Sequence, residues 1–576
     1  MFSSNKLHQP SDTTGRIRWL ICLFFVFILL LGLWTTPHYG LPWDTLDEMD
    51  ILRMNLWEYC QLLGINDDAF QRLAAQRLQA EALNPYIADI SPISQNPHQD
   101  HGEAAYYPLA GVVMSQTISP AHQTLVWHLY TWFLFWLGMI ALYHICRQLG
   151  TSRMIAFAAV AMLLLSPRFF AEGHYNNKDI VFMTLVLLTL WQCLRLMQKP
   201  AWATGVLFAF AGALATSTKI AGVAIFLLCG GFVLLFLLVQ KRFTARHLRI
   251  GVVTLGCFVL FYALLTPALW RNPIGFVRYL AENAMNYTIW QGYVLFRGTV
   301  YNTALTQLPK YYLPYMMLTT IPPWILLCIG GGQLSTILFL FQKKNKTPEK
   351  LVRLLISLLW LIPLGFAVLT GTRVYNGWRH FYFLYGPMLV LSALGLSQLF
   401  NRLREKKPGK LPRRLAAGLL ALCMGASCLS LLRNHPYQYA YFNIFPQLES
   451  RQSISAYLER DYWNVSVANA LKQLSRQLRD DPGVNAAGVP SSVDGVDLWS
   501  RLGVLWALEV DPDATNPLLM YDAQASESPT YLLASHTYQN FSQWEPSPHW
   551  QPIVVLEAYG HPLVTIYQNT ATAMTE

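Results

Sequence analysis

The chain has few charged residues. Only 13% of its 576 residues are Asp, Glu, Lys or Arg, whereas 53% are hydrophobic. A water-soluble domain normally carries about a quarter charged residues, so this composition excludes an ordinary soluble protein. Apolar runs of roughly 18 or more residues recur along most of the length, enough for a helix to cross about 30 Å of hydrocarbon. The sequence therefore predicts an all-α polytopic membrane domain.

The sequence also lacks the cysteine spacing of a disulfide framework or metal site, and it lacks a phosphate-binding glycine loop. The nine cysteines lie mostly inside apolar runs, with neither metal-ligand spacing nor a disulfide framework. The short basic segments between apolar runs contain no glycine-rich loop that would cradle a nucleotide phosphate. These absences exclude a disulfide-scaffolded domain and argue against nucleotide chemistry on the basic side of the membrane. We therefore expect any chemistry on the other side.

The basic segments define a topology. We predict about eleven spans, near residues 17–36, 125–146, 152–167, 179–197, 202–218, 221–240, 249–270, 312–341, 352–370, 380–400 and 414–432. The clusters of Lys and Arg between them then all fall on one side, which the positive-inside rule makes the cytoplasm. The net charge of +10 is thus a topology signal rather than a sign of nucleic-acid binding. A bacterial cytoplasmic membrane is the expected location, with the first span retained as an anchor.

Two domains follow from this orientation. Residues 1–435 form the membrane domain, with a long external loop at 37–124. Residues 436–576 form an extracytoplasmic α/β domain of about 140 residues, long enough for its own core. Within it we predict an amphipathic helix over 462–478, a strand over 529–535 and a hairpin over 553–567. We find no repeat that relates the two halves of the chain.

An acidic segment follows the first span. Asp44, Asp47 and Glu48 share one face if the segment is helical, because their spacing is i, i+3 and i+4. Acidic side chains beside hydrocarbon are costly, so such a cluster is a candidate functional site. The alternative is an amphipathic interfacial helix whose acids are simply solvated. Position alone does not decide between the two.

A dense polar string lies between two predicted spans at residues 166–179. It contains Arg168, His174, Asn177, Lys178 and Asp179. The carboxylate of Asp179 also begins a span, where it favours a helix N-terminus. No spacing typical of metal-binding histidines is present, so we favour hydrogen-bonding and acid roles over a metal site.

Three cationic or titratable residues lie at outer ends of spans. Lys219 is a lone lysine among about forty apolar residues, and Arg379 is followed by His380. An arginine beside a histidine suits a pair of phosphate oxygens. Snorkelling to lipid headgroups is the alternative. We predict that Lys219, Arg379 and His380 bind a phosphorylated lipid head.

Several motifs together resemble a known family. They are Trp43-Asp44 through Glu48, the Arg168 to Asp179 loop, residues 310–324 with Tyr311, residues 377–382, residues 435–443, and Asp461-Tyr-Trp463. In order and sidedness the chain resembles GT-C fold glycosyltransferases, of the group similar to protein O-mannosyltransferases (glycosyltransferase family 39-like). The resemblance covers nearly the whole chain.

The resemblance implies a sugar transfer on the outer face. The donor would be a polyprenyl-phosphate sugar, and an acid of the first external loop would be the base. We rank Asp44 first, then Glu48 and Asp47, although relatives often carry Asp-Glu directly after the tryptophan, where this chain has Asp44-Thr45. Asp179 would orient the acceptor or a metal. Residues 168, 174, 177, 178 and 311 would bind substrate.

Other functions stay open at this stage. A transporter or flippase of lipid-linked sugars would show inverted repeats and charges near the midplane, and neither is clear here. A non-enzymatic membrane assembly protein is a third reading. The sequence identifies no certain cofactor, leaves a divalent metal open, and does not name the sugar. The acceptor can be a glycan, a lipid or a protein.

Overall fold

The computed structural model describes most of the membrane domain and part of the C-terminal domain. The described residues are 13–42, 44–81, 90–285, 292–374, 376–406, 410–451, 453–480, 491–494, 518–520, 531–536 and 547–570.

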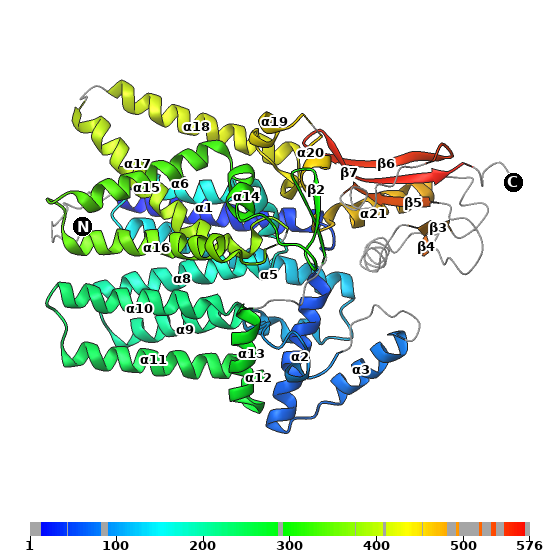
Figure 1. The fold of residues 1–576 in the computed structure, drawn as a ribbon, viewed down its shortest axis with the longest axis horizontal. Helices are drawn as coiled ribbons and strands as arrows, with labels where there is room; N and C mark the ends of the chain where they lie inside the picture. Colours follow the sequence, from blue (N-terminus) through cyan, green and yellow to red (C-terminus); the bar gives the residue numbers. More distant parts are fainter. Residues whose placement is uncertain are drawn as a thin grey trace.

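The larger part of the chain is a bundle of helices lying side by side (Figure 1). Within the described residues, nine helical segments are long and apolar enough to span a membrane. They involve α1 (Thr13–Thr35), α5 (Pro120–Gln148), α8 (Asp179–Gln198), α10 (Ala221–Val239), α11 (Ala245–Leu265), α15 (Pro323–Phe341), α16 (Thr347–Thr370), α17 (Tyr385–Lys406) and α18 (Lys410–Arg433). The shorter apolar helices α6 (Arg153–Leu164) and α9 (Trp202–Thr218) coincide with two further predicted spans. The prediction of a multi-pass helical domain is confirmed.

The helices differ in how deeply the bundle encloses them. In their most apolar windows, 78% of the residues of α8 are buried but only 6% of those of α18. A helix satisfies its own backbone hydrogen bonds, so its apolar side chains can face either protein or lipid. Because α8 is so enclosed, the residue that begins it, Asp179, is held on a rigid element.

One predicted span is interrupted. The sequence suggested a continuous span over 312–341, whereas α14 (Tyr312–Thr320) ends before Ile321-Pro322 and α15 begins at Pro323. Proline lacks a backbone N–H and its ring clashes with the preceding turn, so two adjacent prolines end one helix and start another.

Short elements gather at one end of the bundle (Figure 1). The loop after α1 supplies η1 (Thr36–His38), α2 (Thr45–Leu63), α3 (Asp68–Glu81), η2 (Ile93–Gln95), η3 (Ala104–Leu109) and α4 (Ala110–Val113). Later segments add α7 (Pro167–Glu172), α12 (Ala268–Arg271), α13 (Pro273–Met285), β1 (Tyr293–Phe296), β2 (Thr299–Asn302) and η4 (Arg379–Leu384). Buried Glu58 of α2 accepts hydrogen bonds from Arg271 Nε at 2.6 Å and Ser94 Oγ at 2.6 Å. These bonds join α2, α12 and η2 into one layer.

The C-terminal region begins with η5 (Gln438–Ala440), α19 (Phe445–Glu449) and α20 (Ile454–Tyr457), which are followed by α21 (Val465–Asp480). Beyond them is a five-stranded sheet in the order β4-β3-β5-β7-β6. Its strands are β3 (Ser491–Asp494), β4 (Leu518–Met520), β5 (Tyr531–Ser535), β6 (Trp550–Ala558) and β7 (His561–Asn569). Strand β3 pairs parallel with β4 and β5, and β7 pairs antiparallel with β5 and β6.

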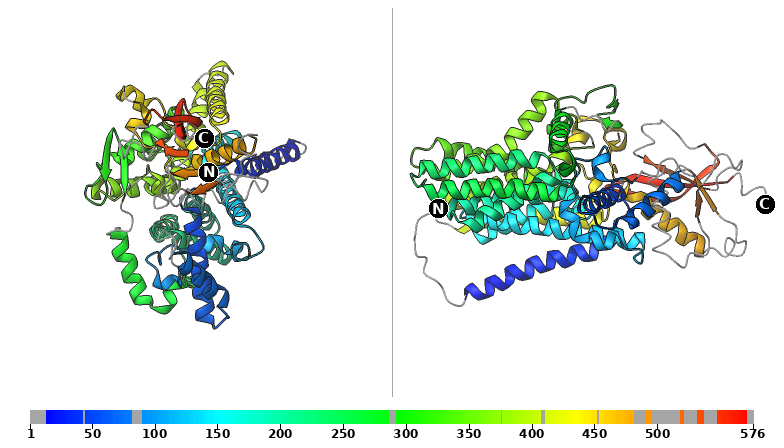
Figure 2. Two further views of the ribbon diagram at one scale, coloured as in Figure 1. Left: turned by 90° about the vertical axis from the view of Figure 1, so that its right-hand side faces the viewer. Right: turned by 90° about the horizontal axis from the view of Figure 1, so that it is seen from below.

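The predicted elements of this region are present. The amphipathic helix is α21, whose buried side Val467, Leu471, Leu474 and Leu478 packs with β5, β6 and β7. The predicted strand is β5, although residues 529–530 lie outside the described residues. The hairpin turns at Tyr559-Gly560, both with positive φ, as a tight antiparallel turn requires. Figure 2 shows the sheet projecting beyond the end of the helix bundle.

Candidate active site

A four-residue charged network forms at one end of the bundle, where the ends of several helices meet. Asp179, at the start of α8, is 2% exposed and forms an ion pair with Lys219. Its other carboxylate oxygen lies 3.7 Å from Nη1 of Arg379, and the same nitrogen donates to Asp44 Oδ2 at 3.1 Å. Two carboxylates and two cations thus alternate. The structure brings together four residues that were predicted as site residues from four separate segments of the sequence.

Local backbone geometry explains these positions. Asp44 is the N-cap residue of α2, and Arg379 opens η4. Lys219 lies in the break between α9 and α10 with an extended backbone, φ −149° and ψ 133°. That break separates its side chain from the apolar faces of both helices. His380 follows Arg379, is half-buried, and lies close enough to interact electrostatically with Asp179.

A second network lies beside the first. Lys178 Nζ contacts Glu103 Oε1 at 2.5 Å and Glu48 Oε2 at 3.2 Å, and Asn177 Nδ2 donates to Glu103 at 3.4 Å. All of these side chains are almost enclosed. The two networks are adjacent, because Gly102 packs on the backbone of Ser217, just before Lys219. A Cβ at Gly102 would lie 2.1 Å from the carbonyl oxygen of Ser217.

The two glutamates beside Lys178 titrate in opposite directions. Burial alone would raise the pKa of Glu48, but the Lys178 ammonium, the hydrogen bond with Glu103 and the nearby His101 together lower that pKa below the usual range. Burial raises the pKa of Glu103 well above its usual value, and Glu48 adds to the rise. Like charges so close disfavour simultaneous ionisation. Of the two carboxyls that contact Lys178, Glu103 therefore binds a proton more readily than Glu48.

Asp44 differs from Glu48 in its surroundings. Its side chain is 35% exposed, whereas that of Glu48 is 8% exposed. Desolvation by the surrounding protein raises the pKa of Asp44, and Glu48 and Asp179 add to the rise, although Arg379 opposes it. Asp47 lies in the first turn of α2 and is half-buried. Among the acids of this segment, Asp44 combines access with a carboxyl that is more basic than usual.

The acids that were predicted to share one helix face contact different partners in the folded chain. Asp44 contacts Arg379, and Glu48 contacts Lys178. Asp50 forms an ion pair with Arg53, which donates to the carbonyl oxygen of Val113 at 3.0 Å. The segment therefore serves two charged networks and one structural brace.

Glu172 links the charged network to the C-terminal region. It is fully buried and accepts hydrogen bonds from Asn176 Nδ2 at 2.6 Å, from Trp463 Nε1 at 3.2 Å and from the Tyr382 hydroxyl. Asn176 also donates to Asp179 at 3.0 Å. Burial raises the pKa of Glu172 to about 7. A continuous chain of bonds therefore runs from Trp463 to Asp179.

Two aromatic residues enclose Arg379. The guanidinium carbon lies 4.9 Å from the ring centre of Tyr462 and 4.7 Å from that of Trp463. Arg379 Nη2 also donates to the Tyr462 hydroxyl at 3.2 Å. Cations over aromatic faces are stabilised most where water is excluded. The segment that begins the C-terminal domain thus forms one wall of the candidate site.

The remaining predicted substrate residues lie apart from this network. His174 is enclosed between Trp132 and Tyr39, and its ring nitrogens face the hydroxyls of Thr36 at 2.8 Å and Thr35 at 3.3 Å. Burial lowers the pKa of His174 well below its usual value, so the ring is neutral. It joins α1 to the 166–179 loop.

Arg168 and Tyr311 contact other parts of the outer layer. The Arg168 guanidinium lies 4.6 Å from the ring centre of Tyr439 and 4.7 Å from that of Phe442. Tyr311 is 48% exposed and accepts a hydrogen bond from Arg297 at 3.1 Å. Substrate contacts for both residues stay predictions.

Sequence reasoning missed several members of these networks. Glu103, Tyr462 and Trp463 were not selected, although the last two lie in a motif that carried the family resemblance, and Glu172 was considered only as a less favoured metal partner of His174. Glu103 follows His98-Gln-Asp-His-Gly, and that density of polar residues was the available signal. Trp43 lies outside the described residues. Among the residues that are described, no group of three or more His, Cys, Asp or Glu is placed to share a metal ion, and the metal question stays open.

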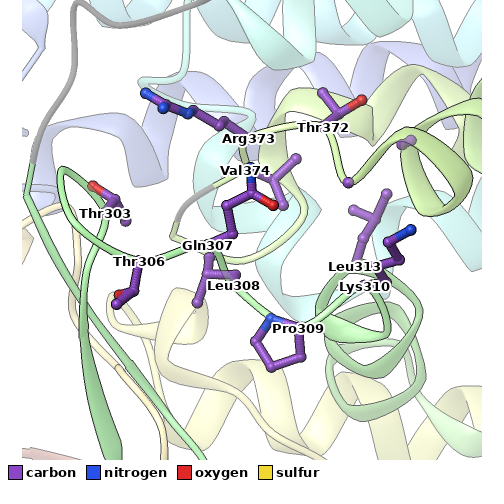
Figure 3. Close-up of a pocket in the computed structure, with 12 residues that line it drawn as sticks. Thr303, Thr306, Gln307, Leu308, Pro309, Lys310, Leu313, Thr372, Arg373 and Val374 are labelled. Atoms are coloured by element: carbon purple, nitrogen blue, oxygen red, sulfur yellow. The ribbon is translucent and has the colours of Figure 1, made fainter.

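A cleft lies beside the segment that precedes Arg379 in the chain. It lies between the segment after β2 and the loop that follows α16, and its empty volume is about 610 Å³ when the space open to solvent is included. Figure 3 shows Lys310 and Arg373 on opposite sides of Gln307 and Val374. The loop that lines it continues through residue 376 to Arg379. The cleft and the charged network therefore belong to the same outer layer.

Comparison with known proteins agrees with the resemblance seen in the sequence. The family of dolichyl-phosphate-mannose-protein mannosyltransferases matches residues 115–270. This stretch begins just before α5, ends within α12, and contains Arg168, Asp179 and Lys219. The predicted resemblance is thus confirmed for these residues. Among curated protein sequences, none matches the chain.

Two solved structures are similar over most of the chain. One is the crystal structure of ArnT from Cupriavidus metallidurans bound to undecaprenyl phosphate, at 15% identity and a TM-score of 0.42, covering 95% of this chain and 98% of ArnT. The other is arabinofuranosyltransferase AftD from mycobacteria, at 14% identity and a TM-score of 0.41, covering 96% of this chain and 41% of AftD. At these scores neither likeness bears on the chemistry of the site.

Proposed function

We propose that this protein is an integral membrane glycosyltransferase. It transfers a sugar from a polyprenyl-phosphate donor to an acceptor hydroxyl on the extracytoplasmic face. The observation that carries the proposal is Arg379, which lies between Asp44 and Asp179 beside Lys219. A carboxylate for a hydroxyl proton and cations for a leaving phosphate thus lie within one network. The family match over residues 115–270 supports the same class of donor.

Asp44 is the proposed general base. Its carboxylate takes the proton of the acceptor hydroxyl, and the oxygen attacks the anomeric carbon of the donor sugar. The bond from that carbon to the phosphate oxygen breaks, and its electron pair leaves with the phosphate. A raised pKa makes Asp44 a better proton acceptor than an ordinary aspartate. Glu48 is less suited, because Lys178 neutralises its charge.

Arg379 and Lys219 stabilise the phosphate that leaves. Charge develops on its oxygens in the transition state, and preorganised cations lower the barrier most when they need no rearrangement. The aromatic rings of Tyr462 and Trp463 hold the guanidinium in place. Asp179 pairs with both cations and orients them before the donor arrives. His380 lies beside them as a further phosphate contact.

The side of the membrane on which the enzyme acts determines which kind of sugar donor it can use. Nucleotide sugars belong to the cytoplasm, so an enzyme that acts outside needs a sugar already activated on a membrane lipid. The network lies at helix ends rather than at mid-bundle, and this placement distinguishes it from the central sites of transporters.

The test measures sugar transfer and donor accumulation. Cells that express wild-type protein, D44N, E48Q or R278K are compared by mass spectrometry of polyprenyl-phosphate sugars and surface glycans. We expect D44N to lower transfer at least a hundredfold and to let the donor accumulate, because general bases typically contribute factors of about 10² to 10⁴. R278K is the matched control, since Arg278 is 80% exposed and pairs only with Glu282 among the described residues.

Full transfer by both D44N and E48Q would refute the transferase proposal. Loss of the surface glycan, with the sugar lipid accumulating on the cytoplasmic leaflet of inverted vesicles, would instead indicate a flippase. The same mass spectra identify the sugar and the acceptor, which the residues do not specify.

A further inference from the structure

A second cavity lies at the opposite end of the bundle from the candidate active site. It lies between the last turns of α5, α8 and α15, the first turns of α16, and α17, and its empty volume is about 550 Å³ when the space open to solvent is included. Its lining is mostly apolar: Leu149, Leu194, Met197, Phe339, Val352 and Leu394. Four polar residues, Gln148, Gln198, Glu349 and Arg353, complete it. None of these ten residues belongs to the charged networks described above.

Two nitrogen atoms of this lining, one on Arg353 and one on Gln148, lack a hydrogen-bond partner among the described residues, although Glu349 lies close enough to Arg353 to interact with it electrostatically. Arg353 is 8% exposed, and its guanidinium lies 4.0 Å from the ring centre of Phe339. Neither Arg353 Nη1 nor Gln148 Nε2 has a hydrogen-bond partner among the described residues. A buried polar group without a partner is costly, more so when it is charged. Both groups are donors, so the missing partner is an acceptor.

Charge and position indicate which class of ligand supplies the missing hydrogen-bond acceptor. Arg353 is a cation, and short segments at this end carry Arg147, Lys199, Lys343 and Lys344. The positive-inside rule assigns this end to the cytoplasm. Basic pockets between membrane helices on that side bind anionic lipid headgroups. An apolar lining around two buried donors suits an amphiphile with acyl chains beside its headgroup.

We propose that this cavity binds the phosphodiester headgroup of an anionic glycerophospholipid from the cytoplasmic leaflet. Arg353 and Gln148 donate to its phosphate oxygens, and the apolar lining receives the first methylenes of the chains. Glu349, one helical turn before Arg353, selects against more negative ligands. A phosphomonoester such as a polyprenyl phosphate carries up to two charges, whereas the phosphodiester carries one. The site is therefore separate from the donor site in both place and ligand.

The test measures retained lipid on the full-length purified protein. Delipidated protein in mild detergent is incubated with phosphatidylglycerol, undecaprenyl phosphate or inorganic phosphate and analysed by native mass spectrometry. We expect wild-type protein to retain one phosphatidylglycerol and R353M to retain at least tenfold less. Q148L should show a smaller, severalfold loss. K344M is the matched control, because Lys344 is an exposed cation at the same end outside the lining.

Two further readouts keep the outcome decisive. E349Q should increase retention of undecaprenyl phosphate, since it removes the charge that opposes a dianion. Melting temperature with and without phosphatidylglycerol should rise for wild-type and K344M but not for R353M. If R353M does not fold, Q148L and E349Q decide. Equal retention by wild-type and R353M, or preferential retention of undecaprenyl phosphate or inorganic phosphate by wild-type, would overturn the proposal. No sugar transfer is measured, so the proposed function is tested independently.

Discussion

Replacing Trp463 separates the two contacts that join the C-terminal region to the candidate site. W463L removes both the aromatic face under Arg379 and the N–H donated to Glu172, whereas W463F keeps an aromatic face and removes only the donor. A desolvated cation–π contact contributes about 1 to 2 kcal/mol. A hydrogen bond to a carboxyl contributes about 1 to 3 kcal/mol.

These magnitudes convert into rates. About 1.4 kcal/mol corresponds to a tenfold change in rate. If half of each contact energy is lost from the transition state, the loss is about 1 to 2.5 kcal/mol for W463L and about 0.5 to 1.5 kcal/mol for W463F. W463L should therefore lower kcat about fivefold to sixtyfold and W463F about twofold to twelvefold. Because Arg379 is proposed to stabilise charge that develops on the leaving phosphate, kcat should fall more than the KM for donor rises.

The assay is sugar transfer by purified protein in nanodiscs over a range of donor concentrations. V555A is the control, because Val555 lies in β6 of the same region and is 45% exposed. We expect V555A to match wild-type protein. Wild-type kinetics for W463L would refute the positioning role, as would a change confined to donor KM. An equal loss in W463L and W463F would assign the effect to Glu172 instead of the ring.

The remaining predictions concern buried carboxyls. Burial raises the pKa values of Glu172 and Glu459 to about 7 in the fold, above the value of about 4.5 that both have when unfolded. The folded state therefore binds these protons more tightly than the unfolded state, so the free energy of unfolding should be highest below about pH 4.5 and fall as pH rises through about 7, by about 3 kcal/mol per residue at most. Chemical denaturation at pH 5 and pH 8 should show a smaller fall for E172Q than for wild-type protein. An equal fall in both proteins would contradict this prediction. K178M should destabilise the protein by about 3 to 5 kcal/mol, because it leaves a buried carboxylate at Glu48 without its counter-charge. E103Q should be nearly neutral in the same melts, because Glu103 binds a proton more readily than Glu48, and equal destabilisation by both variants would disprove that assignment.

The membrane class and the candidate segments follow from local sequence. Long apolar runs with few charges dictate helices, because backbone groups in hydrocarbon must be satisfied within each segment. Acids and cations at helix ends stand out against that background, and Asp44, Asp179, Lys219 and Arg379 were found on this ground. Amphipathic periodicity likewise predicted α21, and alternation with a Gly turn predicted the β6–β7 hairpin.

Pairing between those segments was decided by tertiary structure. Asp44 and Arg379 are 335 residues apart, and Lys219 and Asp179 are 40 apart, so no local rule links them. Glu48 was ranked near Asp44 from sequence, yet packing places it beside Lys178 and leaves Asp44 more accessible. Trp463 reaches Glu172 across 291 residues. Sequence by itself determined which residues are costly to bury in a membrane protein. Only the fold decided which opposite charges and aromatic faces compensate that cost, because compensation depends on distances of a few ångströms between segments far apart in the chain.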